Sequence, residues 1–207
     1  MLQWLRLNGC PWSLSTCCQA SADGRLANLR FARENGCDWG PSVCSAAASN
    51  GHLDILRWAR ENGCSWEGST ILGAATGGHI DVLDWCLARM DCPHVPDRLM
   101  CATAARASQY EVLVWLREKK RFEWDSNTLA CAAETGSFAV VDYCLKGGCP
   151  MDISAVLFAA RANKYQMLKY LVANNCSYDQ SVMAGAADTS NVQMVLYLKE
   201  MGCPMGE

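Results

Sequence analysis

The sequence lacks the marks of several large classes of protein. It has no excess of positive charge, because 18 lysines and arginines stand against 21 aspartates and glutamates and the net charge is −3. Proteins that bind the phosphate backbone of nucleic acids usually present a basic face. No apolar run reaches the roughly 18 residues that a membrane-spanning helix requires. We therefore expect no nucleic-acid partner and no membrane partner.

Catalytic and metal-binding signatures are also missing. Only three histidines occur, His52, His79 and His94, and no motif sets a nucleophile, a base and an orienting group together. Gly77-Gly78 does not follow a strand, as a phosphate-binding loop would. The 14 cysteines contain no Cys-x-x-Cys spacing, although that spacing is typical of zinc sites. We expect no enzyme activity, no cofactor and no metal.

The N-terminal residues 1–22 resemble a secretory signal peptide in one respect. They combine Arg6, a long uncharged stretch and a closing Ala20-Ser21-Ala22. Polar residues and Pro11 interrupt the stretch, however, so the continuous apolar centre of a signal peptide is absent. The same residues fit the repeat described next, and we favour that interpretation.

What the sequence does contain is an internal repeat. A short loop motif, in most units headed by cysteine and followed by an aromatic residue or methionine, recurs at a nearly constant interval along the whole chain. Self-similarity at a fixed period, here about 27 residues, is the signature of a solenoid. The eight motifs are Cys10-Pro11-Trp12, Cys37-Asp38-Trp39, Cys64-Ser65-Trp66, Cys92-Pro93-His94, Phe122-Glu123-Trp124, Cys149-Pro150-Met151, Cys176-Ser177-Tyr178 and Cys203-Pro204-Met205.

The first half of each unit predicts a short helix. It opens on a residue type that caps helix N-termini: Ser15, Ser42, Ser69, Asp97, Asn127, Ser154 and Ser181. An apolar residue follows at Cys17, Cys44, Ile71, Cys101, Leu129, Val156 and Met183. Three residues further on stands an alanine, at Ala20, Ala47, Ala74, Ala104, Ala132, Ala159 and Ala186. This spacing puts both on one helix face, and the unvarying alanine indicates close helix packing.

A break and a second helix complete the unit. The break falls on residues that tolerate the left-handed conformation, namely Gly24, Gly51, Gly78, Ser108, Gly136, Asn163 and Ser190. The second helix carries one aromatic residue in every unit, at Phe31, Trp58, Trp85, Trp115, Tyr143, Tyr170 and Tyr197. In most units it ends at a second glycine or asparagine: Gly36, Gly63, Gly148, Asn175 and Gly202.

The fold class predicted is an all-α solenoid, forming one domain over residues 1–207. Its seven helix-turn-helix repeats span about 10–36, 37–63, 64–91, 92–121, 122–148, 149–175 and 176–202. An N-terminal half repeat covers 1–9 and a tail covers 203–207. A terminal repeat needs a polar outer face, which Leu2, Trp4, Leu5 and Leu7 do not provide. We therefore expect additional repeats or end-to-end stacking at the termini.

The pattern resembles the ankyrin repeat. Ala47-Ala48-Ser49-Asn50-Gly51-His52-Leu53 matches that family's Ala-Ala-x-x-Gly-His-Leu, and Ala74-Ala75-Thr76-Gly77-Gly78-His79-Ile80 is similar. Ankyrin units run about 33 residues, and the residues missing here are those of the β-hairpin finger, which is shortened or absent. The units look like the short Gly-Cys-Pro-Trp-type arrays of large DNA viruses and single-celled eukaryotes. The resemblance implies a concave groove formed by the first helices that contacts protein partners.

The cysteines and tryptophans are interpreted as packing residues. Cysteines one repeat apart should lie at the helix spacing of about 8–10 Å, too far for a disulfide. Free, buried cysteine acts as a compact hydrophobe and implies a reducing compartment, hence the cytoplasm or nucleus. Loop tryptophans should fold over neighbouring helix ends, and charges such as Arg30, Arg57 and Arg60 should form a solvated outer face.

The expected function is a non-catalytic scaffold that binds a protein or peptide. The resemblance places the contacts near the end of each first helix, at Asp23, Asn50, Thr76, Arg106, Glu134, Arg161 and Asp188. Two alternatives stay open. The array could be the targeting arm of a larger adaptor such as a ubiquitin-ligase substrate receptor, or the cysteines could form a metal or redox site.

Overall fold

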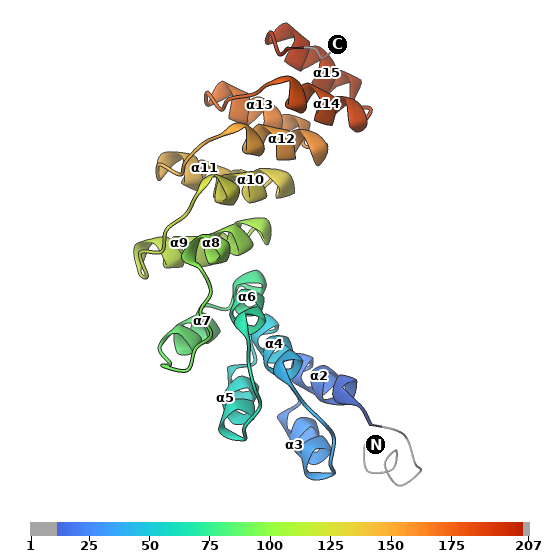
Figure 1. The fold of residues 1–207 in the computed structure, drawn as a ribbon, viewed down its shortest axis with the longest axis vertical. Coiled ribbons are helices and arrows are strands. Elements are labelled where there is room, and N and C mark those ends of the chain that lie inside the picture. The colour runs from blue at the N-terminus through green and yellow to red at the C-terminus, as the bar shows by residue number, and fades with distance from the viewer. Residues whose placement is uncertain (1–11, 205–207) are drawn as a thin grey trace. The chain divides into compact units, whose positions relative to one another are not determined.

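The computed structural model describes residues 12–204, which contain fourteen α-helices and no β-strand (Figure 1). The first helices of the repeats are α2 (Leu14–Ala22), α4 (Pro41–Ser49), α6 (Gly68–Gly77), α8 (Asp97–Arg106), α10 (Ser126–Thr135), α12 (Ile153–Arg161) and α14 (Gln180–Asp188). The second helices are α3 (Leu26–Glu34), α5 (Leu53–Glu61), α7 (Ile80–Leu87), α9 (Tyr110–Glu118), α11 (Phe138–Lys146), α13 (Tyr165–Ala173) and α15 (Val192–Glu200). The predicted half repeat 1–9, the first loop cysteine and the end of the predicted tail lie outside the described residues.

The chain forms two compact units, residues 1–95 and 96–207. Unit 1 contains α2 to α7 and unit 2 contains α8 to α15. Within each unit, successive first helices pack against one another, and each second helix packs on the first helix of its own repeat. Each unit therefore has an inner row of first helices and an outer row of second helices.

The core consists of the predicted small and apolar positions. The seven alanines from Ala20 to Ala186 and the apolar residues three positions before them are all buried. The alanines allow close contact between first helices, and Gly73 shows how close it is. A side chain at Gly73 would collide with the Ser49 hydroxyl of the preceding first helix. The sequence-based prediction of the core is confirmed.

The predicted helix starts are wrong by one or two residues. The N-cap residues are Ser13, Gly40, Glu67, Pro96, Asp125, Asp152 and Asp179. The serines and asparagine predicted as caps lie in the first turn instead, and Asp97 is the first helical residue. In two repeats the backbone amides of Ser154 and Ser181 donate to Asp152 and Asp179 at 2.8 Å. A carboxylate is a stronger acceptor than a hydroxyl, so the N-cap of these two helices lies two residues earlier than predicted.

The predicted breaks between helices are confirmed. All seven residues from Gly24 to Ser190 have positive φ, and so do the predicted second-helix ends from Gly36 to Gly202. In the fourth repeat, where no glycine or asparagine ends the second helix, Arg121 takes the left-handed conformation with φ 58°. None of the described helices is both long and apolar enough to cross a membrane.

Candidate functional site

Most of the cysteines are buried, and several loop thiols make hydrogen bonds that hold the repeats together. All thirteen described cysteines are free, and eleven of them are buried. In four repeats the loop thiol donates to the carbonyl of the N-cap residue 24 positions earlier, which ties the loop to the start of the first helix. These contacts are Cys37 to Ser13 at 3.2 Å, Cys64 to Gly40 at 3.3 Å, Cys149 to Asp125 at 3.2 Å and Cys203 to Asp179 at 3.2 Å. The loop cysteines recur at a constant spacing in the sequence. That spacing predicts that they are buried, but not that their thiols form these hydrogen bonds.

Three buried cysteines on the helices are poor nucleophiles. Burial raises the pKa of Cys86 and of Cys101 to about 12. A hydrogen bond with Cys64 and then burial raise the pKa of Cys44. The thiolate is the form that attacks or binds metal, and it is disfavoured at these positions. Within residues 12–204, no three histidine, cysteine or acidic side chains gather in a way that could hold a metal ion.

The loop tryptophans pack between second helices. Trp39 and Trp66 meet Trp58 and Trp85 edge to face, with ring centroids 5.5 and 5.8 Å apart. An arginine from the preceding second helix also lies over each loop tryptophan, with Arg33 4.8 Å from the Trp39 ring centroid and Arg60 4.7 Å from the Trp66 ring centroid. The predicted packing role is confirmed for these tryptophans.

Arg60 contradicts the prediction of a solvated outer charge. Only 17% of its side chain is exposed. It donates to the Cys64 carbonyl and to Asp91, the latter at 2.7 Å. Its planar guanidinium can stack on Trp66 while it makes these bonds, which a helical charge pattern does not reveal.

The two histidines of the repeat connect neighbouring repeats. The Nε2 atom of His52 lies 3.0 Å from the Ala22 carbonyl, and Nε2 of His79 lies 3.2 Å from the Ser49 carbonyl. Each ring reaches the end of the preceding first helix. These histidines therefore hold adjacent repeats in register.

The seven predicted contact residues lie on the surface of their units, near the ends of the first helices. In unit 1 their side chains already form hydrogen bonds with nearby residues. Asn50 donates to Ala46 of its own helix at 2.9 Å, and Thr76 donates to Leu72 at 2.9 Å. Asp23 accepts a bond from Gln19 at 2.7 Å. In unit 1 these three predicted residues thus make hydrogen bonds within their own repeat.

In unit 2 the structure brings three of the predicted residues together. Arg106 and Glu134 form an ion pair at 3.3 Å. Glu134 and Arg161 line one hollow of about 290 Å³, with Phe158 and Ala162. Arg106, Glu134, Arg161 and Asp188 alternate in charge along the row of first helices. We call the exposed surface of α8, α10, α12 and α14 around these four residues the first-helix face.

Two residues of this face were missed by the sequence-based prediction. Phe158 is half-buried and stands next to Arg161 in the hollow. Gly185 lies under the stem of Arg161, and a side chain there would approach the Arg161 Cγ atom to 3.1 Å. Phe158 and Gly185 both directly precede the repeat alanine. Phe158 is the one aromatic residue at this position and is visible in the sequence, whereas Gly185 shares its residue type with Gly73 of the third repeat.

Comparisons with known proteins support the fold. No protein-family model matches the sequence, and no curated protein matches it. Among solved structures, the human ASB11 ankyrin repeat domain is similar, with a TM-score of 0.60 over 87% of this chain and 96% of that domain. The fold is that of an ankyrin repeat solenoid. At 18% identity, the likeness concerns the fold alone, and the shorter period distinguishes this chain from the usual ankyrin unit.

Proposed function

We propose that this protein is a non-catalytic scaffold that binds a protein or peptide on the first-helix face of unit 2. The observation that carries the proposal is the alternation of Arg106, Glu134, Arg161 and Asp188 at the repeat period, beside the hollow at Phe158. Acidic residues at a helix C-terminus oppose the helix dipole. The helix dipole therefore gives no reason for Glu134 and Asp188 at these positions, and Asp188 lacks the ion pair that Glu134 makes with Arg106; recognition of a charged partner accounts for the alternation.

Arg161 is the strongest binding group of this face. Arg106 and Glu134 neutralise each other, whereas no described residue forms an ion pair with the exposed Arg161. A guanidinium can bind a carboxylate through two parallel hydrogen bonds. Because Phe158 offers an aromatic surface in the same hollow, the ligand expected is an acidic residue with an apolar neighbour in the partner chain.

The proposal is tested by selecting binders from a random peptide library displayed on phage. Selected peptides are then measured against the triple variant Arg106→Glu, Glu134→Arg, Arg161→Glu. The variant keeps an ion pair between positions 106 and 134 but reverses the sign of the charge at all three substituted positions. We expect the affinity to fall at least about tenfold, which is about 1.4 kcal/mol. Equal affinity for the two proteins would show that the ligand binds elsewhere.

The same surface can serve a free-standing scaffold or the recognition arm of a larger adaptor, and the peptide measurement applies to both. We also infer that the chain belongs with the short cysteine- and tryptophan-rich arrays. Support comes from the thiol contacts at a constant separation along the chain. Further support comes from Trp39 and Trp66, which lie in the loops where longer units carry a hairpin and pack edge to face on second-helix tryptophans.

A further inference from the structure

The first-helix face carries opposite charges at the same position of two pairs of neighbouring repeats, but only one of these pairs is joined. Arg106 at the end of α8 forms an ion pair at 3.3 Å with Glu134 near the end of α10. Arg161 and Asp188 are the last residues of α12 and α14, two repeats further on. No described residue forms an ion pair with either of them. Unit 2 therefore presents one neutralised pair of charges and one pair that is available to a partner.

The helix ends show what Asp188 lacks. The C-terminal end of an α-helix carries a partial negative charge, which disfavours a carboxylate and favours a cation there. Neither α10 nor α14 has a basic residue in its own last turn. At the end of α10, Arg106 of the preceding repeat supplies the cation for Glu134. At the end of α14 the exposed Asp188 has no such cation among the described residues, so a partner can supply it.

Arg161 contacts other neighbours than Asp188. Its stem packs on Gly185 of α14, where a side chain would approach the Arg161 Cγ atom to 3.1 Å. The same residue lines the hollow of about 290 Å³ together with Glu134 and Phe158. The guanidinium can therefore bind a carboxylate of a partner at this hollow, while Asp188 stays free to bind a second group of the same partner.

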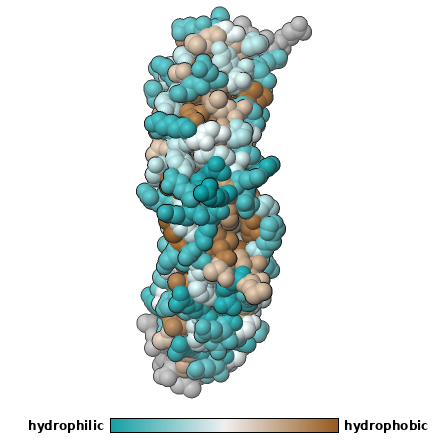
Figure 2. Space-filling model, turned by 90° about the vertical axis from the view of Figure 1, so that its left-hand side faces the viewer, coloured by the Kyte–Doolittle hydropathy of each residue, from teal (hydrophilic) through white to brown (hydrophobic). Residues whose placement is uncertain are grey.

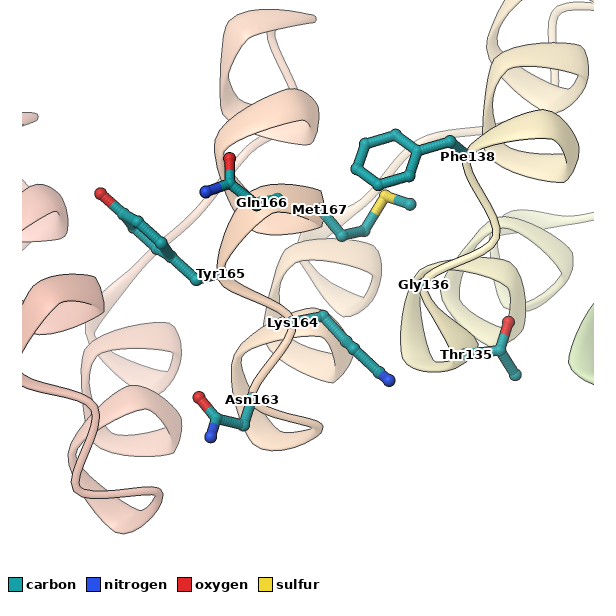
Figure 3. A pocket seen from close by; sticks show the side chains of 8 residues that line it. All are labelled: Thr135, Gly136, Phe138, Asn163, Lys164, Tyr165, Gln166 and Met167. Carbon is teal, nitrogen blue, oxygen red and sulfur yellow. The ribbon is translucent and has the colours of Figure 1, made fainter.

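The ends of α12 and α14 are held together by the turns that follow them. The side-chain amide of Asn191 donates a hydrogen bond to the side-chain carbonyl of Asn163 at 2.6 Å. Figure 3 shows the Asn163 side chain at the turn after α12, where it points away from Thr135 of the preceding repeat. Arg161 and Asp188 stand two and three residues before these asparagines. Both charges thus lie on a fixed support, which lowers the cost of ordering the site when a ligand binds.

We propose that the first-helix face binds a segment that carries both charges, with a carboxylate on Arg161 and a lysine or arginine side chain on Asp188. This inference rests on the proposed function and adds the charge pattern of the partner. A segment with acidic residues alone would meet both Asp188 and the negative end of α14, and a segment with basic residues alone would meet Arg161. Since like charges across an interface are strongly disfavoured, the mixed segment is the one that satisfies both residues.

The test starts from peptides selected on the wild-type protein from a random library displayed on phage, and fluorescence polarisation gives each dissociation constant. The selected peptides should contain both an acidic and a basic residue. Asp188→Arg should weaken binding of such a peptide at least about tenfold, because the basic side chain of the peptide meets a like charge. Replacing that basic residue of the peptide by glutamate should restore binding to Asp188→Arg to within about threefold of the original pair, as a double-mutant cycle requires for a direct contact.

The outer row provides the matched control. Figure 2 looks onto the second-helix side and shows hydrophobic patches set among hydrophilic side chains. Glu200 is the last residue of the second helix α15 and is exposed. Glu200→Arg therefore makes the same change of charge at the same kind of helix end, outside the first-helix face, and should leave the dissociation constant within about twofold. An arginine at the end of α14 agrees with the helix dipole, so Asp188→Arg should keep its helix content, which circular dichroism checks.

The proposal is supported if Asp188→Arg loses binding and the glutamate peptide recovers it. If Arg161→Glu weakens binding but Asp188→Arg does not, the mixed charge pattern is wrong while the proposed function stands. A loss that the glutamate peptide does not recover, or an equal loss in Glu200→Arg, would also overturn the charge pattern. If neither Arg161→Glu nor Asp188→Arg changes the dissociation constant, or if no selected peptide binds more tightly than about 1 mM, both the inference and the proposed function are wrong.

Discussion

At the scale of single residues, unit 1 is held by charged groups on aromatic rings. Asp91 accepts hydrogen bonds from Arg60 at 2.7 Å and from Arg89 at 2.9 Å, while its carbonyl accepts one from the Trp66 indole. The two guanidiniums lie over the Trp66 and Trp85 rings. The hydrogen bond from Arg60, followed by that from Arg89, lowers the pKa of Asp91 below its ordinary value of 3.8. The ionised form of Asp91 is therefore stabilised more strongly in the folded than in the unfolded chain.

This coupling predicts a pH dependence for Asp91→Asn. A lowered folded-state pKa gives stability that is fully present above the unfolded value and lost as the pH falls through the folded value. The free energy of unfolding should therefore differ between wild type and Asp91→Asn at pH 7, by up to about 1 kcal/mol for a partly exposed ion pair. The difference should shrink as the pH falls below 3.8 and vanish once the pH lies below the lowered folded-state pKa, where the carboxyl is protonated in both states.

The measurement is urea unfolding of both proteins at several pH values, followed by tryptophan fluorescence. Asp38→Asn is the matched control, because Asp38 is another exposed aspartate of unit 1. A gap between wild type and Asp91→Asn that stays constant from pH 7 to pH 3 would mean that the charge of Asp91 has no part in the contact.

At the scale of elements, the helices begin and end for local reasons. The residues with left-handed backbone conformation, from Gly24 to Ser190, are predictable because a positive φ is required of one residue at a time and favours glycine or asparagine there. The helix starts are harder to predict because aspartate and serine both cap helices and stand two residues apart in the same loops. In the structure the N-cap is Asp152, whose side chain accepts hydrogen bonds from both the backbone amide and the hydroxyl of Ser154.

The two cap assignments predict different mutational effects. Asp152→Ala removes the acceptor for the Ser154 amide and should lower the free energy of unfolding by about 1 kcal/mol. Ser154→Ala keeps that backbone donor and its acceptor, so its effect should stay below about 0.5 kcal/mol. Urea unfolding monitored by the helical circular dichroism signal measures both. A larger loss for Ser154→Ala than for Asp152→Ala would restore serine as the cap.

At the scale of the molecule, the repeat period predicts the fold, because a helix pair as short as this one can bury its apolar face only against its neighbours. The contacts between repeats are less predictable. The pattern of its own helix predicts Arg60 to be a solvated charge. In the structure, Trp66 and Asp91 of the next repeat enclose its side chain. Arg161 is recognisable as a surface position, but the glycine that supports it, Gly185, belongs to the following repeat. Contacts of this kind form between two neighbouring repeats, so they cannot be predicted from the sequence of a single repeat.

The two units also differ in what their first helices display. In unit 1, hydroxyl and thiol groups bond one another, with Ser45 and Ser69 at 2.9 Å and Cys18 and Ser42 at 3.2 Å. In unit 2 the matching surface is charged, with Arg161 free of any ion pair among the described residues. Since binding needs groups that are not already satisfied within the protein, the charged face of unit 2 is the recognition surface we propose, with Arg161 at its centre.

The most direct measurement is the dissociation constant of a library-selected peptide for wild type and for the single variant Arg161→Glu, by isothermal titration calorimetry. Arg25→Glu in unit 1 is the matched control, because it makes the same change in net charge at an exposed arginine. Arg161→Glu should raise the dissociation constant at least about tenfold, since the ligand's carboxylate would meet a like charge, while Arg25→Glu should leave it within about twofold. Equal dissociation constants for wild type and Arg161→Glu would contradict recognition through the first-helix face.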